Sequence, residues 1–228
     1  MKKSKIQLWV AILLMVLIVA IDQWIKIYIK THFVLHESYK VTSWFYLSFI
    51  ENNGMAFGME LVGKLWLTLF RIVAVAMFGW FLFSRIKTQK STYSFVVSMS
   101  MVIAGAIGNI IDCIFYGRWF TAGFGKVAQW ADAEKGLMPY GEWLQGKVVD
   151  MFYFPLIRFD WPDWMPHSGQ LMDWGIRFYW PSWMPCSNEP FMFFKPVFNF
   201  ADAAISVGVA FLFIIYYIST RNEGKSAK

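Results

Sequence analysis

Four long runs of apolar residues dominate the chain, and each is long enough to cross a lipid bilayer. They cover residues 7–29, 65–83, 94–115 and 198–218. A hydrocarbon core about 30 Å thick needs about 20 apolar residues in helical form, so each run predicts one membrane-spanning helix. The pattern therefore predicts an all-α integral membrane protein in which residues 1–228 form a single membrane domain with four transmembrane helices.

The two long connections between these runs follow other patterns. Residues 31–63 are rich in β-branched and aromatic side chains and are punctuated by glycines, which predicts a small β-rich element. Residues 116–197 form a long aromatic insertion with an internal repeat, RFDWPDWMP at 158–166 and RFYWPSWMP at 177–185. Prolines exclude a regular helix there, and the repeat fits either a duplicated hairpin or tryptophans lying at the membrane surface.

The net charge of +6 is informative through the positions of the basic residues. They precede the first run, fill the loop between the second and third runs, and follow the fourth run: Lys2, Lys3, Lys5, Arg85, Lys87, Lys90, Arg221, Lys225 and Lys228. By the positive-inside rule both termini are cytoplasmic, and the two long connections lie outside. No basic patch remains for nucleic acid. The chain has two cysteines, Cys113 and Cys186, which can pair on the outer side but form no disulfide framework.

Several polar side chains interrupt the apolar runs at a similar depth, near their outer ends. They are Asp22, Asn109, Asp112, Asn199 and Asp202. A carboxylate within a bilayer costs roughly 2.5–3.5 kcal/mol, so we expect these groups to meet in one site just inside the outer leaflet. The two N-x-x-D pairs, 109–112 and 199–202, should each lie on one helical face.

Arginine 71 interrupts the second run and has three possible environments. Arg71 can pair with an aspartate, contact a lipid phosphate, or extend its side chain to the membrane surface. The sequence alone does not choose among them.

The residue types available at this depth point to carboxylate chemistry. The chain contains no H-E-x-x-H, G-x-S-x-G or phosphate-loop motif, so we predict neither a metal nor a cofactor. Two adjacent carboxylates share one proton, so one can accept a proton from water while the other donates to a leaving amine. This is the arrangement of an aspartic protease.

Two other functions remain open from the residues alone. A small proton-coupled transporter or channel subunit would need acids through the whole depth of the bilayer, but the inner halves of the four runs contain none. In an inert scaffold the aspartates would serve packing only, and their replacement would change stability more than activity.

Five segments of the chain resemble motifs of lipoprotein signal peptidase (signal peptidase II), the aspartic protease of the bacterial inner membrane. DQWIK (22–26) resembles D-Q-x-x-K, and NNGMAFG (52–58) resembles N-x-G-x-A-F. GAIGNIID (105–112) and VVDMF (148–152) resemble G-N-x-x-D and V-V-D-F, and FNFADAAISVG (198–208) resembles F-N-x-A-D-x-x-I-x-x-G. The motifs keep the family's order and involve the first, third and fourth apolar runs and both outer connections, whereas the long outer inserts are not covered.

The resemblance implies a catalytic pair, Asp150 and Asp202, that faces the periplasm at the outer leaflet. It also implies substrate-binding or supporting roles for Asp22, Lys26, Asn52, Gly54, Asn109, Asp112 and Asn199. The implied substrate is a prolipoprotein with diacylglycerol on its lipobox cysteine, cleaved just before that cysteine, and the implied inhibitor is globomycin. The only other partners implied are membrane lipids; a monomer suffices for the chemistry.

The chain departs from the family pattern in two places. Cys113 stands where the family usually has arginine after G-N-x-x-D, which puts a substrate contact in doubt and makes Arg71 a candidate replacement. About thirty residues, roughly 118–147, intervene before VVD. If that alignment is wrong, Asp112 replaces Asp150 in the pair; we favour Asp150 because the motif resumes cleanly at Val148.

Overall fold

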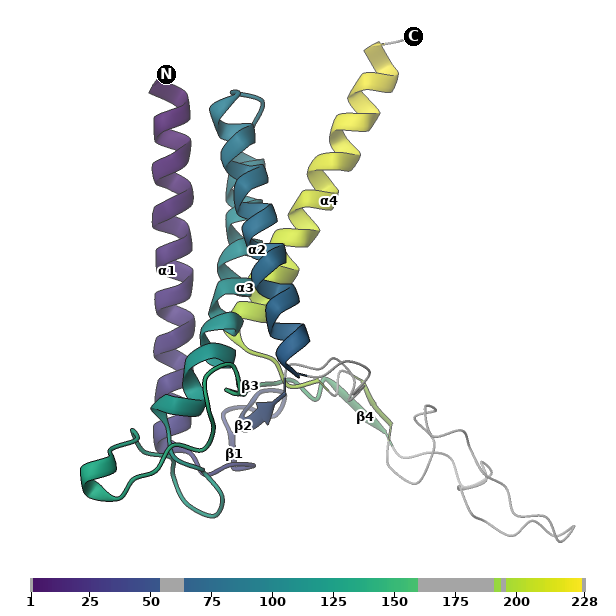
Figure 1. Ribbon diagram of the computed structural model, residues 1–228. Coiled ribbons are helices and arrows are strands. Elements are labelled where there is room, and N and C mark those ends of the chain that lie inside the picture. Colours follow the sequence, from purple (N-terminus) through teal and green to yellow (C-terminus); the bar gives the residue numbers. More distant parts are fainter. Residues whose placement is uncertain (1, 54–63, 160–190, 194–195, 227–228) are drawn as a thin grey trace, which may run out of the picture. The chain divides into compact units, whose positions relative to one another are not determined.

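The computed structural model describes residues 2–53, 64–159, 191–193 and 196–226. Within this part, four helices are long and apolar enough to cross a membrane. They are α1 (Lys2–His32), α2 (Lys64–Lys87), α3 (Tyr93–Trp119) and α4 (Phe200–Ser226) (Figure 1). The four predicted helices are thus confirmed, and all of them extend past the expected bounds at one or both ends. Gly54, Cys186 and most of the tryptophan–proline repeat lie outside the described residues.

The chain divides into two compact units. One comprises Met1–Glu37, Phe49–Met151 and Phe198–Lys228, and therefore holds all four of the helices named above. The other comprises Ser38–Ser48 and Phe152–Val197. Its described residues include a stack of aromatic rings, in which the centroids of Phe45 and Phe154 are 4.8 Å apart.

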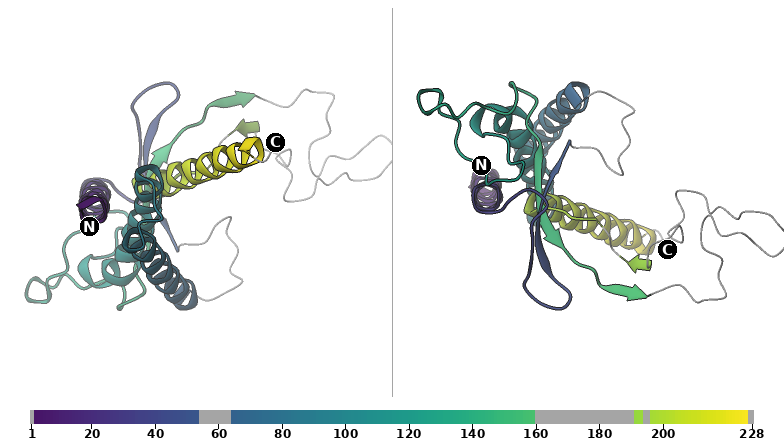
Figure 2. Two further views of the ribbon diagram at one scale, coloured as in Figure 1. Left: turned by 90° about the horizontal axis from the view of Figure 1, so that it is seen from above. Right: turned by 90° about the horizontal axis from the view of Figure 1, so that it is seen from below.

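Helix α3 lies at the centre of the helical unit and packs against α1, α2 and α4 (Figure 2). Its glycines make the contact with α4 close, because a Cβ on Gly105 would collide with the carbonyl oxygen of Ala201. A Cβ on Gly108 would lie 2.5 Å from an Asp22 carboxylate oxygen. Small residues therefore let the helix backbones approach and leave room for a carboxylate between them.

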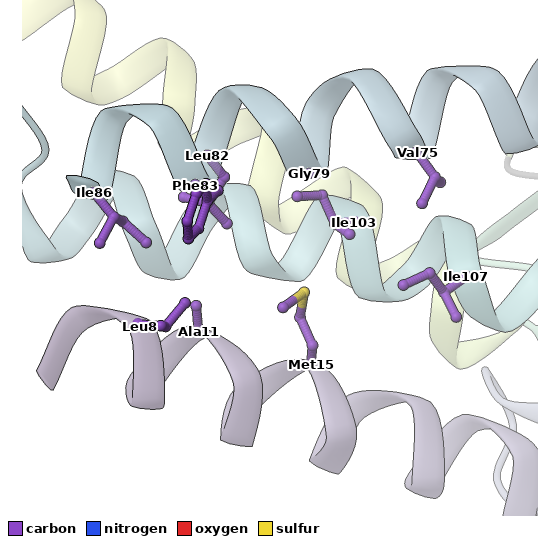
Figure 3. A pocket seen from close by; sticks show the side chains of 10 residues that line it. All are labelled: Leu8, Ala11, Met15, Val75, Gly79, Leu82, Phe83, Ile86, Ile103 and Ile107. Carbon is purple, nitrogen blue, oxygen red and sulfur yellow. The ribbon is translucent and has the colours of Figure 1, made fainter. Parts of the chain in front are cut away.

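An apolar pocket of about 260 Å³ lies between α1, α2 and α3, at the level of the first turns of α1 and the last turns of α2 (Figure 3). It is lined by Leu8, Ala11, Met15, Val75, Gly79, Leu82, Phe83, Ile86, Ile103 and Ile107. A Cβ on Gly79 would meet no atom within 4 Å, so this glycine is not required by close packing.

Alanine substitutions at two helical glycines should therefore have opposite effects. Gly79→Ala should stabilise the protein by about 0.5–1 kcal/mol, because alanine loses less backbone entropy than glycine in a helix. Gly105→Ala should destabilise it by about 1–3 kcal/mol, because the added methyl overpacks the contact with α4. Thermal unfolding midpoints in detergent micelles test both, and shifts in the same direction would contradict the packing described here.

Three strands form a small sheet in the order β1 (Ser38–Lys40), β2 (Tyr46–Asn52) and β3 (Val148–Tyr153). Strands β1 and β2 pair antiparallel with Ser38 opposite Ser48, which confirms the β-rich element expected in residues 31–63. Strands β4 (Ile157–Phe159) and β5 (Phe191–Phe193) form a second antiparallel pair.

The insertion between α3 and β3 leaves α3 and returns to it. It contains a short 3-10 helix, η2 (Ala133–Lys135). On its return, the amide of Gly141 donates to Gly117 O at 3.0 Å, and the amide of Gly146 donates to Cys113 O at 2.9 Å. A Cβ on Gly146 would collide with the carbonyl oxygen of Asp112. The insertion therefore begins and ends beside the last turns of α3, and β3 starts next to Asp112.

Candidate functional site

Two aspartates from different elements meet at one asparagine, Asn199, which bonds one carboxylate through its side chain and the other through its backbone amide. Asn199 Nδ2 donates a hydrogen bond to Asp150 Oδ1 at 2.7 Å, and the Asn199 amide donates to Asp202 Oδ2 at 3.4 Å. Asp150 comes from β3, and Asp202 comes from the first turn of α4. The structure thus brings together the two residues that the resemblance makes catalytic.

Two further asparagines complete the contacts of this pair. Asn109 Nδ2, from α3, donates to Asp202 Oδ1 at 2.8 Å, and Asn52 Nδ2, from β2, lies 3.4 Å from Asp150 Oδ2. Asn199 Nδ2 also reaches Asn109 Oδ1 at 3.1 Å. Each carboxylate is therefore held by amide donors from two sides.

Asn199 caps helix α4, which corrects the prediction that the helix includes residues 198 and 199. Asn199 Oδ1 accepts a hydrogen bond from the Asp202 amide at 2.9 Å, while the Asn199 amide donates back to the Asp202 carboxylate. This reciprocal pattern is a capping box, so the N-x-x-D spacing at 199–202 marks a helix start and not two residues on one helical face. Asp202 consequently lies where the helix dipole favours a negative charge, which offsets part of its desolvation cost.

A buried lysine links Asp22 and Asp112, the two acids to which the resemblance assigns supporting roles. Lys26 Nζ lies 2.9 Å from Asp22 Oδ2 and 2.7 Å from Asp112 Oδ2. It also donates to Asn109 Oδ1 at 2.9 Å. The side chains of all three charged residues are at most 1% exposed. We call Asp22, Lys26 and Asp112 the Lys26 cluster.

The Lys26 cluster holds the backbone directly before each aspartate of the pair. Asp22 Oδ1 accepts a hydrogen bond from the Ala201 amide at 2.9 Å, and Asp112 Oδ2 accepts one from the Val149 amide at 3.4 Å. These amides belong to the residues that precede Asp202 and Asp150. The cluster therefore fixes the start of α4 and the start of β3 relative to each other.

Gln23 is a member of this network whose contribution the sequence did not reveal. Its Nε2 lies 2.9 Å from Asp112 Oδ1, 3.2 Å from Asp22 Oδ2 and 3.1 Å from Gly108 O. Its Oε1 accepts from Tyr116 Oη at 3.1 Å. The available signal was its place in the DQWIK motif, directly after Asp22.

Asp112 and Asp150 differ in the partners of their carboxylate oxygens. Both Asp112 oxygens are engaged, one by Lys26 and Val149 and the other by Gln23, and the side chain is fully buried. Asp150 is instead bonded by Asn52 and by Asn199, and Asn199 also contacts Asp202. The geometry therefore favours Asp150 over Asp112 as the partner of Asp202.

The environment of Asp150 raises its proton affinity. Burial, followed by the neighbouring Asp202 carboxylate, raises the pKa of Asp150 from 3.8 to about 7. Hydrogen bonds from Asn199 and Asn52 and the charge of Lys26 act in the opposite direction. Near neutral pH the pair can therefore hold one proton, which is the state that acid–base chemistry on an amide requires.

Arg71 of α2 points to the position at which the chain departs from the family motif. Arg71 Nη1 lies 3.6 Å from the Sγ of buried Cys113. The structure does not test whether Cys113 pairs with Cys186, because Cys186 lies outside the described residues. Among the residues that the structure describes, no group of three His, Cys, Asp or Glu side chains is arranged to hold a metal ion.

Comparison with known proteins places this arrangement in one family. The model of the signal peptidase II family matches residues 14–218. A lipoprotein signal peptidase of Porphyromonas gingivalis is 45% identical over 203 residues, which cover 89% of this chain and 80% of that protein. One from Amoebophilus asiaticus is 32% identical, covering 86% of this chain and 72% of that protein.

A solved structure described as a bacterial membrane enzyme has the same fold. It aligns with a TM-score of 0.58 and 21% identity, covering 93% of this chain and 90% of the other. The family model matches most of the chain, and the described residues include four helices long and apolar enough to cross a membrane. The chain belongs to the signal peptidase II family and is a multi-pass bacterial membrane protein.

Proposed function

We propose that this protein is an aspartic endopeptidase that removes the signal peptide from diacylglyceryl-modified prolipoproteins, cutting just before the lipidated cysteine. The observation that carries the proposal is the contact of Asp150 and Asp202 with one shared asparagine, Asn199. The family's lipoprotein signal peptidases support the substrate class. One chain supplies every member of the proposed site, so we propose a monomer.

The proposed location is the bacterial inner membrane, with both termini in the cytoplasm and the site facing the periplasm. Basic residues in the last turn of α2 and beyond the N-terminal end of the first apolar run support this orientation. The aspartate pair belongs to the opposite ends of the helices. A substrate tethered by its acyl chains would present the scissile bond at the same level, near the outer leaflet.

In the proposed mechanism the two carboxyl groups have different roles. Asp202, supported by the dipole of α4 and by Asn109, carries the negative charge and accepts a proton from the attacking water. Asp150 holds the proton that moves towards the carbonyl oxygen and then to the leaving amine as the C–N bond breaks, and the proton that Asp202 took from water then restores the single proton shared by the pair. The amides of Asn52, Asn109 and Asn199 orient the carboxyl groups and are in position to bind the peptide beside them.

The direct test is incubation of the purified protein with a diacylglyceryl-modified prolipoprotein, followed by mass analysis of the products. The expected products are the free signal peptide and a lipoprotein that begins with the lipidated cysteine. Cleavage should be inhibited by globomycin. Intact substrate after prolonged incubation with folded protein would rule out the proposed function.

The pH dependence should report the proton on Asp150. Because the pKa of Asp150 is raised to about 7, the cleavage rate should fall as pH rises above about 7. The free energy of unfolding should depend on the protonation of the same group. The folded state binds the proton on Asp150 more tightly than the unfolded chain does, so this contribution to stability is lost as pH rises from about 4 to about 7. Asp150→Asn should remove this part of the pH dependence of the unfolding midpoint. A midpoint difference that does not vary over that interval would contradict the assignment.

Arg71 has a proposed role in substrate binding, because a cation within a membrane span that faces the bundle interior usually serves function. Arg71→Gln should raise KM for the prolipoprotein about tenfold, whereas kcat should change little, since the guanidinium does not touch the aspartate pair. Arg71→Lys keeps the charge and serves as the matched variant. A change in kcat with an unaltered KM would contradict the role.

A further inference from the structure

A second buried lysine cluster lies at the outer end of α1, separate from the Lys26 cluster. Both oxygens of Glu51 are paired, Oε1 with Lys30 Nζ and Oε2 with Lys147 Nζ, the latter at 3.1 Å. The Lys30 side chain is fully buried, and that of Glu51 is 7% exposed. We call Lys30, Glu51 and Lys147 the outer cluster.

Aromatic rings surround the ammonium group of Lys30. Its Nζ lies 4.8 Å from the ring centroid of Tyr140, 5.4 Å from that of Phe120 and 5.7 Å from that of Phe49. Cations are attracted to ring faces at these distances, and more strongly where water is excluded. Two of the rings, Phe120 and Tyr140, belong to the insertion that follows α3.

The outer cluster joins three parts of the chain that are distant in sequence. Lys30 lies in the last turn of α1, Glu51 belongs to β2, and Lys147 directly precedes β3. The Lys147 backbone amide also donates to Tyr140 Oη at 2.9 Å, so the insertion contacts the residue of the outer cluster that precedes β3. Although burial would raise the pKa of Glu51, the charges of Lys30 and Lys147 hold it below its ordinary value, so the Glu51 carboxyl group is ionised at neutral pH.

The neighbours of the cluster along β2 and β3 are members of the site. Asn52 directly follows Glu51, and Asp150 lies three residues after Lys147. At 3.4 Å, the Asn52–Asp150 contact is the longest of the described hydrogen bonds that join two side chains among the aspartate pair and its asparagines, so a small shift between the strands would break it first. Buried ion pairs are weak sources of net stability, so their retention here favours a geometric role.

We propose that the outer cluster positions Asn52 relative to Asp150. It fixes β2 against the start of β3 so that Asn52 stays within reach of Asp150, and it connects the insertion to both strands. The proposal rests on the proposed protease function for its kinetic consequence. Lys30, Glu51 and Lys147 are thus positioning residues, because they act through Asn52 and do not contact the substrate.

The test uses Lys147, because removing a fully buried partner can prevent folding whereas the Lys147 side chain is 32% exposed. Lys147→Met keeps the length of the side chain and removes its charge; we expect kcat to fall about tenfold with KM unchanged, since small misplacements of catalytic groups are costly. Lys147→Arg should retain wild-type activity. The matched control is Glu142→Gln, which breaks an exposed ion pair with Arg118 in the same insertion and should have no effect.

A double-mutant cycle decides whether Lys147 acts through Asn52. In an Asn52→Ala background, Lys147→Met should cause no further loss of kcat. An equal loss in both backgrounds, a kcat within twofold of wild type, or an equal effect of Glu142→Gln would each overturn the proposal.

A readout independent of catalysis separates this proposal from the protease function. Infrared titration of aspartate carboxyl groups, with Asp150→Asn as the reference, reports the pKa of Asp150. The charged groups facing it are Asp202 of α4 and Lys26 of α1, and the Asn52 hydrogen bond lowers its pKa. Lys147→Met should therefore raise that pKa in the wild-type background and leave it unchanged with Asn52→Ala. If the wild-type protein cleaves no prolipoprotein, the function fails while this titration still decides the positioning.

Discussion

Replacing either Asp150 or Asp202 with asparagine should reduce prolipoprotein cleavage by at least about a thousandfold, because each change removes a group that moves a proton in the reaction. The amide is nearly isosteric with the carboxyl group and can still accept a hydrogen bond from Asn199 or Asn109. Both variants should therefore remain folded and inserted in the membrane. Initial cleavage rates and unfolding midpoints, measured on the same preparations, provide the comparison.

The control for these variants is Asp132→Asn in the insertion, where the carboxylate pairs with exposed Lys135 at 2.7 Å. This change should leave the cleavage rate within twofold of wild type. If Asp150→Asn retained substantial activity while Asp112→Asn lost it, Asp112 would be the partner of Asp202. If Asp150→Asn, Asp202→Asn and Asp112→Asn all lost activity in proportion to lost folded protein, the three aspartates would be structural.

Replacing Lys26 with methionine should destabilise the protein by about 3–5 kcal/mol, because Asp22 and Asp112 would remain buried without a counter-charge. Such a loss corresponds to an unfolding midpoint lower by about 10 °C or more. Activity should fall as well, since these two acids hold the amides that precede the aspartate pair. Thermal unfolding in detergent measures the first effect.

Two comparisons isolate the buried charge as the cause. Lys135→Met removes a lysine–aspartate pair of equal 2.7 Å length that is 75% exposed on the lysine side, so it should lower the unfolding midpoint far less than Lys26→Met does. The double variant Lys26→Met/Asp112→Asn should recover part of the stability, because one unpaired carboxylate is neutralised. Equal midpoints for Lys26→Met and Lys135→Met would refute the ion-pair explanation.

Local features of the fold were readable because they are encoded over a few residues. Apolar runs of membrane-spanning length predicted the four helices, since the apolar character of a span is a property of adjacent positions. A local signal was nevertheless misread at Asn199. An asparagine followed by an aspartate three residues later also marks a helix start, and the contacts of these two side chains show that the capping pattern holds.

The sequence predicted that the buried polar residues would meet, but it did not predict which of them would be in contact. The energetic cost of a carboxylate in the bilayer indicated that Asp22, Asp112 and Asp202 would meet polar partners. Nothing local indicated that Asp22 would cap α4 through Ala201, or that Arg71 would reach Cys113. Such contacts depend on which helix faces oppose each other, and that is settled by packing of small residues such as Gly105 and Gly108.

By itself the sequence determined the four spans, the kind of chemistry available to them, and a resemblance to one family through five short segments. Tertiary structure alone decided that the insertion returns to α3, that Asp150 meets Asp202 at Asn199, and that Lys30, Glu51 and Lys147 converge. The physical reason is the separation along the sequence between the residues that interact. Spans and caps arise from residues that are neighbours along the chain. Contacts among residues about 20 to 120 positions apart arise only when helices pack and long loops close.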